Sequence, residues 1–343
     1  MRSSAVVVLG LALLVTGCTR TANQGGDDDA PGDAAPDAPG PGCFPTSPRS
    51  TSVEAFVAPT GLQSRITSLI DSAQTKLDIQ MYLFTVSAIA DRVIAAHQRG
   101  VDVRVILDPD HEGNLTTRTR LTSAGVPNRN APALYSFSHA KYLLVDGKTA
   151  LVMSANFNVD AMDSERNYGI VDRDADDFAD LQAIFDQDWA GGGGEPPRPA
   201  DLSCTRLIVA PNNARARLLD HIASATQTLD VEALYVSDDE IRSAIVAAKS
   251  RGVRVRVLIE GSSDDAGSTA VFKAAGIEVH YATSFYLHAK LIVADGVAFV
   301  GSQNFSFSGL DKNREVGALV FEPAAEAIIQ QQFETDWSST PAQ

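Results

Sequence analysis

The strongest constraint on the fold of this chain is an internal duplication. Residues 135–169 read YSFSHAKYLLVDGKTALVMSANFNVDAMDSERNYG, and residues 286–317 read YLHAKLIVADGVAFVGSQNFSFSGLDKNREVG. Each segment contains His-x-Lys in an apolar run, an Asp-Gly turn, a second apolar run and Ser-x-Asn, a pattern typical of a β-hairpin. Side chains two apart in a strand leave the same face, so the spacing predicts that each His lies beside its Lys.

The duplication continues through the rest of the apolar chain. Periodicity predicts strands at 53–57, 77–81, 101–107, 207–210, 229–233 and 253–259. It predicts amphipathic helices at 62–73, 88–99, 214–225 and 240–251. Gly100 and Gly252 end the second helix of each copy, and the strands that follow end in Asp108 and Glu260. This alternation predicts an α/β fold of two pseudo-symmetric repeats, each a mostly parallel mixed sheet flanked by helices.

Composition divides the chain into five predicted segments. They are a signal peptide at 1–17, a flexible tether at 18–42, repeat 1 at 43–190, a linker at 191–201 and repeat 2 at 202–338. The tether has no aliphatic side chain larger than Ala, so it cannot bury enough surface to fold. The linker reads GGGGEPPRPAD, and its glycines and prolines are expected to stop a helix.

The N-terminus has the pattern of an export signal. A positively charged start, MRSS, precedes an apolar run that is too short to span a bilayer as a helix. The sequence Val15-Thr16-Gly17-Cys18 resembles a bacterial lipobox, so we expect Cys18 to be lipidated and to anchor the protein to a membrane. An ordinary signal peptide with an incidental Cys is the alternative. The residue after Cys18 is Thr19, whereas an Asp at that position would resemble an inner-membrane retention signal. This favours an outer-membrane lipoprotein in the periplasm or at the cell surface.

Two cysteines remain when Cys18 is set aside. Cys43 begins the first repeat and Cys204 begins the second. In an exported protein, two leftover cysteines suggest a disulfide between them, and free buried thiols are the alternative.

The charge balance bears on the substrate. The formal net charge is −15, and aspartates of the tether supply only five of the negative charges. Proteins that grip phosphate backbones usually carry a basic field, so this acidity disfavours nucleic acid as the natural substrate, although a local basic cleft could survive it.

The paired motifs resemble the signature of the phospholipase D superfamily. That signature is His-x-Lys, four residues, Asp, six residues and Gly-Ser-x-Asn. The first copy keeps the spacing with Met153 in place of Gly, and the second keeps Gly301 but has one residue fewer after Asp295. The resemblance covers nearly all of residues 50–338. It implies that both repeats of one monomeric chain pack about a pseudo-two-fold axis and bring both His-x-Lys segments to one cleft.

The residue types fit phosphodiester cleavage. The reaction needs an in-line nucleophile, a proton for the leaving oxygen, and donors for the non-bridging oxygens. The candidate catalytic residues are His139, Lys141, His288, Lys290, Asn156, Asn304 and Glu315. The expected phosphate donors are Ser154 and Ser302, and the supporting residues are Asp146, Asp295, Asn167 and Glu165. No metal-ligand motif is present in the sequence, so neither a metal nor another cofactor is expected.

The roles of the two histidines depend on their expected partners. Alignment of the copies places Asn167 opposite Glu315, so Asn-x-Glu in the second copy is reversed in the first. A carboxylate beside His288 would favour its imidazolium form, and an amide beside His139 would leave that ring neutral. We therefore expect His139 to be the nucleophile that forms a phosphohistidine and His288 to be the general acid. The resemblance implies the same order.

The motif Asp residues and the nearby aromatic residues have structural interpretations. Asp146 and Asp295 lie an odd number of residues from their His, which favours a role in anchoring the hairpins over catalysis. The aromatic residues near the motifs are Tyr135, Phe137, Phe157, Phe285, Tyr286, Phe305 and Phe307. We expect them to be core residues, and an apolar lip for acyl chains is the alternative.

These features predict an exported, metal-independent phosphodiesterase that cleaves phospholipid head groups or transfers the phosphatidyl group to another alcohol. A non-specific endonuclease of the same superfamily is the first alternative. A binding module that lost turnover is the second, suggested by Met153, the shortened second hairpin and the exchanged Asn and Glu. The sequence does not distinguish hydrolysis from transfer, and it does not identify the head group.

Overall fold

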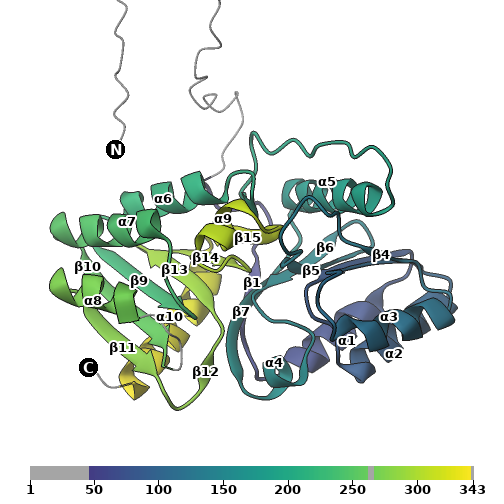
Figure 1. Cartoon of the computed structure of the whole chain (residues 1–343), viewed down its shortest axis with the longest axis horizontal. Coiled ribbons are helices and arrows are strands. Elements are labelled where there is room, and N and C mark those ends of the chain that lie inside the picture. Colours follow the sequence, from purple (N-terminus) through teal and green to yellow (C-terminus); the bar gives the residue numbers. More distant parts are fainter. Residues whose placement is uncertain (1–45, 262–265, 341–343) are drawn as a thin grey trace, which may run out of the picture. The chain divides into compact units, whose positions relative to one another are not determined.

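Two α/β repeats form the described part of the chain. The computed structural model describes residues 46–261 and 266–340, which belong to one packed unit. Each repeat contains a mixed sheet with helices against it, and the two sheets lie side by side (Figure 1). The duplication read from the sequence is therefore confirmed as a structural duplication.

The first sheet is built mainly from repeat 1. Its strands run in the order β1-β7-β6-β5-β2-β3-β4, and β12 of repeat 2 pairs with β7. The strands are β1 (Glu54–Ala58), β2 (Lys76–Met81), β3 (Asp102–Leu107), β4 (Asn128–Asn130), β5 (Lys141–Val145), β6 (Thr149–Met153), β7 (Glu165–Asp172) and β12 (Tyr286–Leu287).

The second sheet repeats the plan with the order β11-β10-β9-β13-β14-β15-β8. Its strands are β8 (Leu207–Ala210), β9 (Thr228–Ala233), β10 (Arg254–Glu260), β11 (Glu278–Ala282), β13 (Lys290–Ala294), β14 (Val297–Gly301) and β15 (Glu315–Val320). The registers match between repeats, since Gln80 lies opposite Tyr142 and Glu232 lies opposite Leu291. This match defines equivalent positions in the two halves.

The mixed sheets confirm the predicted fold class, but the expectation of mostly parallel pairing is wrong. Along each strand order in the described residues, four pairings are antiparallel and two are parallel. The antiparallel pairings arise because each His-x-Lys segment leads into a tight hairpin and because the last strand of each repeat comes back to pair with the first.

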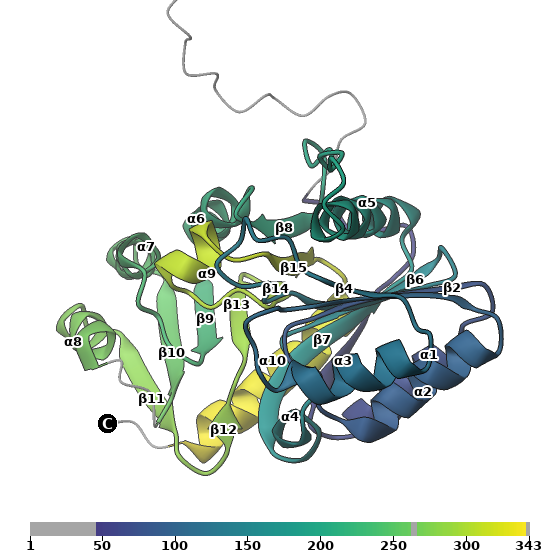
Figure 2. The ribbon, with the colours of Figure 1, turned by 45° about the vertical axis from the view of Figure 1, so that its right-hand side comes forward.

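The helices cover the sheets on both sides. They are α1 (Leu62–Ser72), α2 (Ser87–Gln98), α3 (Asn114–Ser123), α4 (Val159–Asp163), α5 (Ala175–Gly192), α6 (Ala214–Ser224), α7 (Asp239–Ser250), α8 (Ala266–Ala274), α9 (Phe307–Asp311) and α10 (Pro323–Ser339). In Figures 1 and 2, α1–α3 lie against the outer side of the first sheet and α6–α8 against the outer side of the second.

Two outer cores and one shared core hold these layers together. Leu62, Ile66 and Ile70 recur along one face of α1 and belong to the outer core of repeat 1. The shared core joins both repeats, because Tyr142 of β5 and Leu291 of β13 belong to the same buried cluster, as do the apolar faces of α5 and α10. Burial on both faces of each sheet explains why the central strands read as continuous apolar runs.

The predicted helix ends are confirmed at the two glycines. Gly100 and Gly252 have φ of 91° and 93°, a region that glycine enters without the steric cost of a side chain. The amide of Gly100 donates to the carbonyl of His97, and the amide of Val101 donates to that of Ala96, which closes α2.

The start of the predicted linker belongs to a helix. Helix α5 extends to Gly192, so the first two glycines of the 191–201 segment are helical. A Cβ at Gly192 would collide with the carbonyl oxygen of Asn130, so glycine permits a close approach to β4 here. The predicted signal peptide and tether lie outside the described residues. Within the described ranges, none of the helices is long and apolar enough to cross a membrane.

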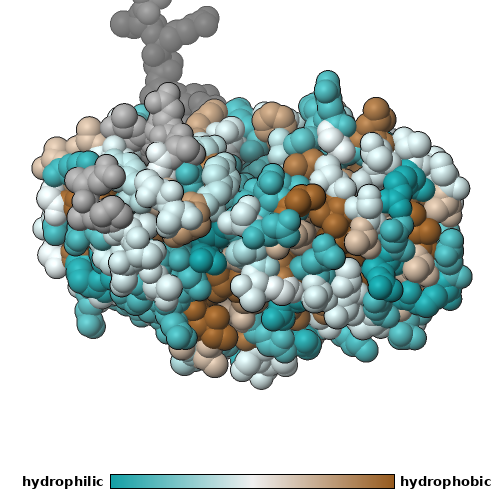
Figure 3. Space-filling model, turned by 90° about the horizontal axis from the view of Figure 1, so that it is seen from below, coloured by the Kyte–Doolittle hydropathy of each residue, from teal (hydrophilic) through white to brown (hydrophobic). Residues whose placement is uncertain are grey.

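The molecular surface is largely hydrophilic on the face seen from below, where apolar residues form separate patches (Figure 3). This distribution agrees with an acidic protein whose apolar side chains mostly fill the three cores.

Candidate active site

The backbone of each His-x-Lys segment is hydrogen-bonded to the backbone of the other repeat. The amide of His139 donates to the carbonyl of Arg314 over 2.9 Å, and the amide of His288 donates to that of Arg166 over 3.0 Å. In the second case Tyr286 and Leu287 form β12 alongside β7. The two His-x-Lys segments therefore meet at the boundary between the repeats, as the resemblance implies.

The partners of the two histidines correct the predicted assignment. His139 Nδ1 lies 2.9 Å from both carboxylate oxygens of Glu315, and His288 Nδ1 lies 2.9 Å from Asn167 Oδ1. The carboxylate is thus beside His139 and the amide beside His288, the reverse of the expectation. That expectation paired each His with its own repeat, whereas the strand crossing supplies each partner from the other repeat.

Glu165 and Asn313 complete this exchange of partners. Asn313 Nδ2 donates to Glu315 Oε1 over 3.0 Å, and Asn167 Nδ2 donates to Glu165 Oε2 over 3.3 Å. Glu165 Oε2 also lies 3.8 Å from His288 Nδ1. Each half of the site therefore holds one Asn and one Glu, with Glu in direct contact with His139 and Asn in direct contact with His288.

Two Arg–Asp pairs, one buried and one partly buried, fix the strands that carry these partners. Arg314 makes two bonds of 2.9 Å to Asp188 of α5, and Arg166 bonds Asp336 of α10 over 2.7 and 3.2 Å. Each pair joins one repeat to the last helix of the other. Paired bonds of this kind set orientation as well as distance, so they fix the strands from which Glu315 and Asn167 project.

The acids that end β3 and β10 hold the backbone just before each histidine. Asp108 Oδ2 accepts the amide of Ser138 over 2.7 Å, and Glu260 Oε2 accepts the amide of Leu287 over 2.5 Å. Asp108 and Glu260 are buried. The paired acids noted in the sequence therefore position the catalytic segments, and burial raises the pKa of Asp108.

The two lysines are buried within the site. Lys141 Nζ donates to the carbonyl of His139 over 2.6 Å, and Lys290 Nζ donates to that of His288 over 2.5 Å. Burial lowers the pKa of Lys141 to about 7, against the opposing pull of Glu315, Asp108 and Glu165. Burial and the nearby Lys141 lower the pKa of Lys290 well below its usual range. A bound phosphate would relieve this repulsion.

Burial favours the neutral form of both histidines. Burial lowers the pKa of His139, and the neighbouring Glu315 opposes that shift. Burial lowers the pKa of His288 further, and the charges of Lys290 and Lys141 act in the same direction. With Nδ1 directed at an oxygen acceptor, the Nε2 of each ring is left for chemistry.

The predicted phosphate donors Ser154 and Ser302 bond within the protein instead. Ser154 Oγ donates to Asn167 Oδ1 over 2.8 Å and accepts the amide of Tyr168. Ser302 Oγ accepts the amide of Val316 over 3.1 Å and lies 3.2 Å from its carbonyl. Both hydroxyls are buried, so they fix the strands that carry the histidine partners.

The motif asparagines keep unused hydrogen-bonding capacity. The buried Oδ1 atoms of Asn156 and Asn304 have no hydrogen-bond partner among the described residues. Buried amides usually satisfy their polar atoms within the protein. An unpartnered Oδ1 can only accept a hydrogen bond, so the Nδ2 group of each amide is the one that would donate to a phosphoryl oxygen.

Asp146 and Asp295 anchor the hairpins, as predicted. Asp146 accepts the amides of Gln74, Thr75 and Lys76, and Asp295 accepts those of Thr226, Gln227 and Thr228. Against the small effect of burial, these bonds lower the pKa of each Asp to about 2. Each carboxylate therefore stays ionised and is engaged in these hydrogen bonds, as expected for a structural anchor.

The aromatic residues divide between core and surface. Tyr135, Phe157 and Phe305 are buried, as expected for core residues, and Phe285 is half-buried. In contrast, Phe137, Tyr286 and Phe307 expose 42%, 43% and 59% of their surface, so the core expectation is wrong for these three. The signal that separates them is position, since Phe137 and Tyr286 lie two residues before a catalytic His and Phe307 begins a short helix.

A family model described as "Cardiolipin synthase, PLD-like domain" matches residues 66–189 and 218–337, more than half of the chain. The chain belongs to the phospholipase D superfamily. The two matched stretches fall on the two repeats, each of which carries one His-x-Lys segment.

Two curated relatives of this chain are named for cardiolipin. A probable cardiolipin synthase of Bacillus subtilis is 25% identical over 307 residues, which cover 77% of this chain and 61% of that protein. A mitochondrial cardiolipin hydrolase of Chlamydomonas reinhardtii is 30% identical over 126 residues, 36% of this chain and 56% of that protein. The chain thus spans about three fifths of the length of these curated relatives.

Solved structures show the same phospholipase D fold. A phosphatidylserine synthase of Haemophilus influenzae aligns with a TM-score of 0.68 at 13% identity and covers 85% of this chain and 87% of that one. A polyphosphate kinase of Porphyromonas gingivalis aligns with a TM-score of 0.65 at 18% identity, over 82% of this chain and 46% of that one.

Sequence reasoning missed the groups that support the phospholipase D site. The missed residues are Arg166, Arg314, Asp188, Asp336 and Tyr82. The signal for the first four was present, because Arg lies between Asn and Glu in both copies and Asp precedes Trp at both ends. The ring of Tyr82 lies 4.6 Å from that of His139 and has no aromatic equivalent in repeat 2.

The remaining predicted sites concern cysteines and metals. Cys204 is disulfide-bonded. Cys18 and Cys43 lie outside the described residues, so lipidation and the pairing with Cys43 remain predictions. Within the part of the chain that the structure describes, no group of three or more His, Cys, Asp or Glu side chains is arranged to hold a metal ion.

Proposed function

We propose that this protein is a phosphodiesterase of phospholipase D type that acts on phospholipids, either releasing the head group or transferring the phosphatidyl group to another alcohol. The observation that carries the proposal is the meeting of His139 and His288, each with its Nδ1 fixed by a partner from the other repeat. In this arrangement the Nε2 atom of each ring is available for the reaction. One Nε2 can attack phosphorus and the other can give a proton to the leaving oxygen.

His139 is the nucleophile in this proposal, for a reason that replaces the one drawn from the sequence. Attack through Nε2 leaves a proton on Nδ1, so the phosphorylated ring carries positive charge. Glu315 lies 2.9 Å from that Nδ1 and stabilises the charge within a buried site. The same charge on His288 would contact the amide oxygen of Asn167, with Lys290 nearby and the Glu165 carboxylate farther away, at 3.8 Å.

His288 is the general acid. Burial and the charges of Lys290 and Lys141 lower the pKa of His288, and the negative phosphodiester opposes this shift, which favours the protonated ring that the step needs. In the first step His139 Nε2 bonds to phosphorus, the bond from phosphorus to the leaving oxygen breaks, and that oxygen takes the proton of His288. In the second step His288 removes a proton from water or an alcohol, whose oxygen attacks phosphorus and releases His139.

Lys141, Lys290, Asn156 and Asn304 bind the non-bridging oxygens in this scheme. Two ammonium groups and two amides match the negative charge that phosphoryl transfer spreads over those oxygens. The two lysines are buried at the boundary between the repeats, where desolvation strengthens such contacts.

Phospholipid is supported as the substrate class by three features. The relatives are a probable cardiolipin synthase and a cardiolipin hydrolase by name. The net charge of −15 disfavours long phosphate backbones. The predicted lipidation at Cys18, outside the described residues, would hold the enzyme at its substrate, and metabolic labelling with a fatty acid should be lost in Cys18→Ser.

The test is product release by the full-length protein in detergent micelles with EDTA. Phosphatidylglycerol, phosphatidylethanolamine, cardiolipin and plasmid DNA are offered side by side, with His139→Ala as the control. Phosphatidic acid from a lipid, absent in the control, is the expected result. Nicked DNA with intact lipids would make the protein a nuclease and refute the charge argument. Absence of any product would favour a binding module.

A further inference from the structure

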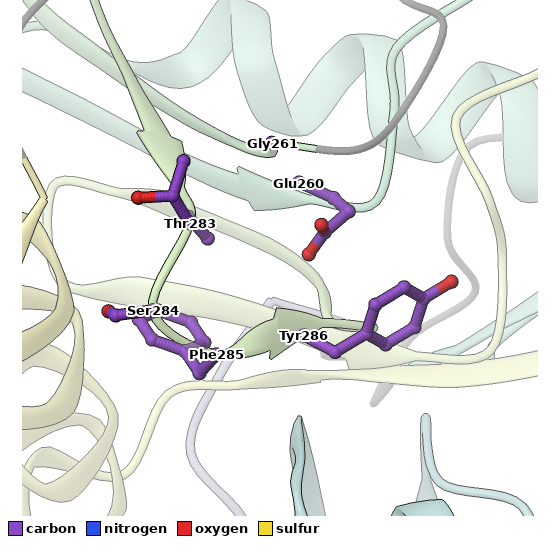
Figure 4. Close-up of a pocket in the computed structure, with 7 residues that line it drawn as sticks. Glu260, Gly261, Thr283, Ser284, Phe285 and Tyr286 are labelled. Atoms are coloured by element: carbon purple, nitrogen blue, oxygen red, sulfur yellow. The ribbon is translucent and has the colours of Figure 1, made fainter.

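A cavity lies beside the His288 half of the site. It has a volume of about 460 Å³ and lies at the ends of β10 and β11 and along the loop into β12. Its lining residues are Glu260, Gly261, Ala282, Thr283, Ser284, Phe285 and Tyr286. In Figure 4 the Glu260 carboxylate points into the space between Thr283 and Tyr286.

Two contacts connect the cavity to the catalytic centre. The ring of Tyr286, which lines the cavity, lies 6.4 Å from that of His288 at an interplanar angle of 18°. Glu260, on the opposite wall, accepts the amide of Leu287, the residue before His288. Substrate atoms that leave the phosphorus on the His288 side therefore have this cavity next to them.

The ring of His139 in repeat 1 lies beside a group of aromatic rings. The ring of Tyr82 lies 4.6 Å from His139, 5.0 Å from His111 and 6.0 Å from Phe137. The matched registers place Leu234 at the position of Tyr82 in repeat 2. The surroundings of the two histidines thus differ in their aromatic side chains as well as in their charged partners.

The direction of the reaction assigns the cavity beside His288 to the alcohol. In-line displacement by His139 places the leaving oxygen on the opposite face of the phosphorus, where His288 delivers its proton. The head-group alcohol departs on that side, and the incoming alcohol or water arrives there in the second step.

The lining selects a class of alcohol. It offers one buried carboxylate, from Glu260, together with the hydroxyls of Thr283, Ser284 and Tyr286. None of the seven lining residues is basic. A head group with hydroxyl or ammonium donors can be satisfied there, whereas a carboxylate would meet like charge without a counter-ion.

We infer that this cavity is the head-group subsite, which holds the leaving and then the incoming alcohol and accepts polyols or amino alcohols that carry no carboxylate. The inference rests on the proposed phospholipid function and adds its specificity. Thr283 is the lining residue suited to testing this selection, because it lies on an exposed loop, where substitutions do not disturb the core.

The test compares Thr283→Trp and Thr283→Lys in the full-length protein with wild type, in micelles of matched acyl chains. The substrates are phosphatidylglycerol, phosphatidylethanolamine, phosphatidylserine and phosphatidylmethanol. Wild type should favour the first two over phosphatidylserine by about tenfold. Thr283→Trp should raise KM for phosphatidylglycerol by about tenfold and change that for phosphatidylmethanol by less than about twofold, because methanol needs little space. Thr283→Lys should improve phosphatidylserine relative to phosphatidylglycerol by about tenfold.

Leu134→Trp is the matched control, since Leu134 is an exposed residue of the equivalent loop in repeat 1. It should leave head-group preference unchanged. If wild type cleaves phospholipids but the Thr283 variants act on all four head groups in the wild-type order, the subsite assignment is wrong and the proposed function stands. If wild type cleaves none of the four lipids, the proposed function is wrong and the subsite falls with it.

Discussion

The two halves of the active site share a backbone plan and differ in chemistry. In both, the His-x-Lys segment pairs with a strand from the other repeat, the Lys bonds the carbonyl of its own His, and an acid holds the preceding amide. The difference lies in the partner of the ring, a carboxylate at His139 and an amide at His288. Duplication therefore supplies the frame, and single side chains assign the roles.

The crossing of strands changes how this asymmetry arises. Because Glu315 belongs to repeat 2 but serves the histidine of repeat 1, a change in one copy alters the chemistry of the other. Aligned positions in two repeats are then poor guides to contacts within each repeat. The comparison between the halves can be tested by changing matched residues on the two sides.

The largest difference is expected between the two histidines. His139→Ala should abolish the covalent phosphoenzyme and lower turnover by at least about 10⁴-fold. His288→Ala should still form the adduct from a substrate with a good leaving group, such as a nitrophenyl phosphodiester, but should hydrolyse it about 10²- to 10⁴-fold more slowly. Acid-labile, base-stable labelling after rapid quenching measures the adduct.

Adduct formation in the two variants decides which histidine is the nucleophile. An adduct retained in His139→Ala and lost in His288→Ala would reverse the roles and with them the argument from Glu315. Loss in both variants, with the fold intact by circular dichroism, would show that the two rings act only as a unit.

The next largest difference is expected in how much the two Arg–Asp pairs that join the repeats contribute to stability. Arg314 is almost fully buried and bonds Asp188, Tyr135 and Asn212, so Arg314→Met should cost about 3–5 kcal/mol of unfolding free energy by leaving Asp188 uncompensated. Arg166 exposes 18% of its side chain, so Arg166→Met should cost about 1–2 kcal/mol. Urea titration measures both, and equal costs would contradict the difference in burial.

Much of the fold could be predicted because it follows from local patterns. Apolar periodicity and the terminating glycines located the main helices and strands within one or two residues, for example α1 at Leu62–Ser72 against the predicted 62–73. The prevalence of antiparallel pairs was missed because strand pairing depends on contacts between segments that are far apart in the sequence. The helical glycines of α5 were missed because the close approach to Asn130 is invisible in a sequence.

The site was predictable in its residues but less so in their contacts. Repetition identified His139, Lys141, His288 and Lys290, and odd spacing correctly assigned the motif aspartates to the hairpins. The crossing of partners depends on how two sheets pack, which no spacing within one copy encodes. The serines were misassigned for the same reason, since the strand that occupies their hydroxyls lies further along the chain.

The histidine partners provide the third comparison. Glu315→Gln should lower kcat by about 10²- to 10³-fold, because the cationic phosphohistidine loses its carboxylate. Asn167→Asp should have a smaller effect on kcat, about tenfold or less, because it adds a carboxylate to a ring that receives no phosphoryl group.

The pH profile separates this chemistry from misfolding. Glu315 raises the pKa of His139, so Glu315→Gln should lower that pKa and shift the acid limb of kcat/KM to lower pH. Asn167→Asp should raise the pKa of His288. Lower activity with an unshifted profile in both variants would indicate damage to the fold and contradict the electrostatic roles.

The smallest expected effect concerns the charge of Lys141. Lys141 has a pKa of about 7 because burial outweighs the pull of Glu315, Asp108 and Glu165. It is protonated below that pH and loses its charge above it. Dimethyl phosphate carries one negative charge across this range, so its affinity should fall about tenfold between pH 6 and pH 9. Calorimetry measures the fall. Removing Glu315 lowers the pKa of Lys141, so in Glu315→Gln the fall should begin at lower pH. Constant affinity in wild type would mean that Lys141 keeps an ordinary pKa.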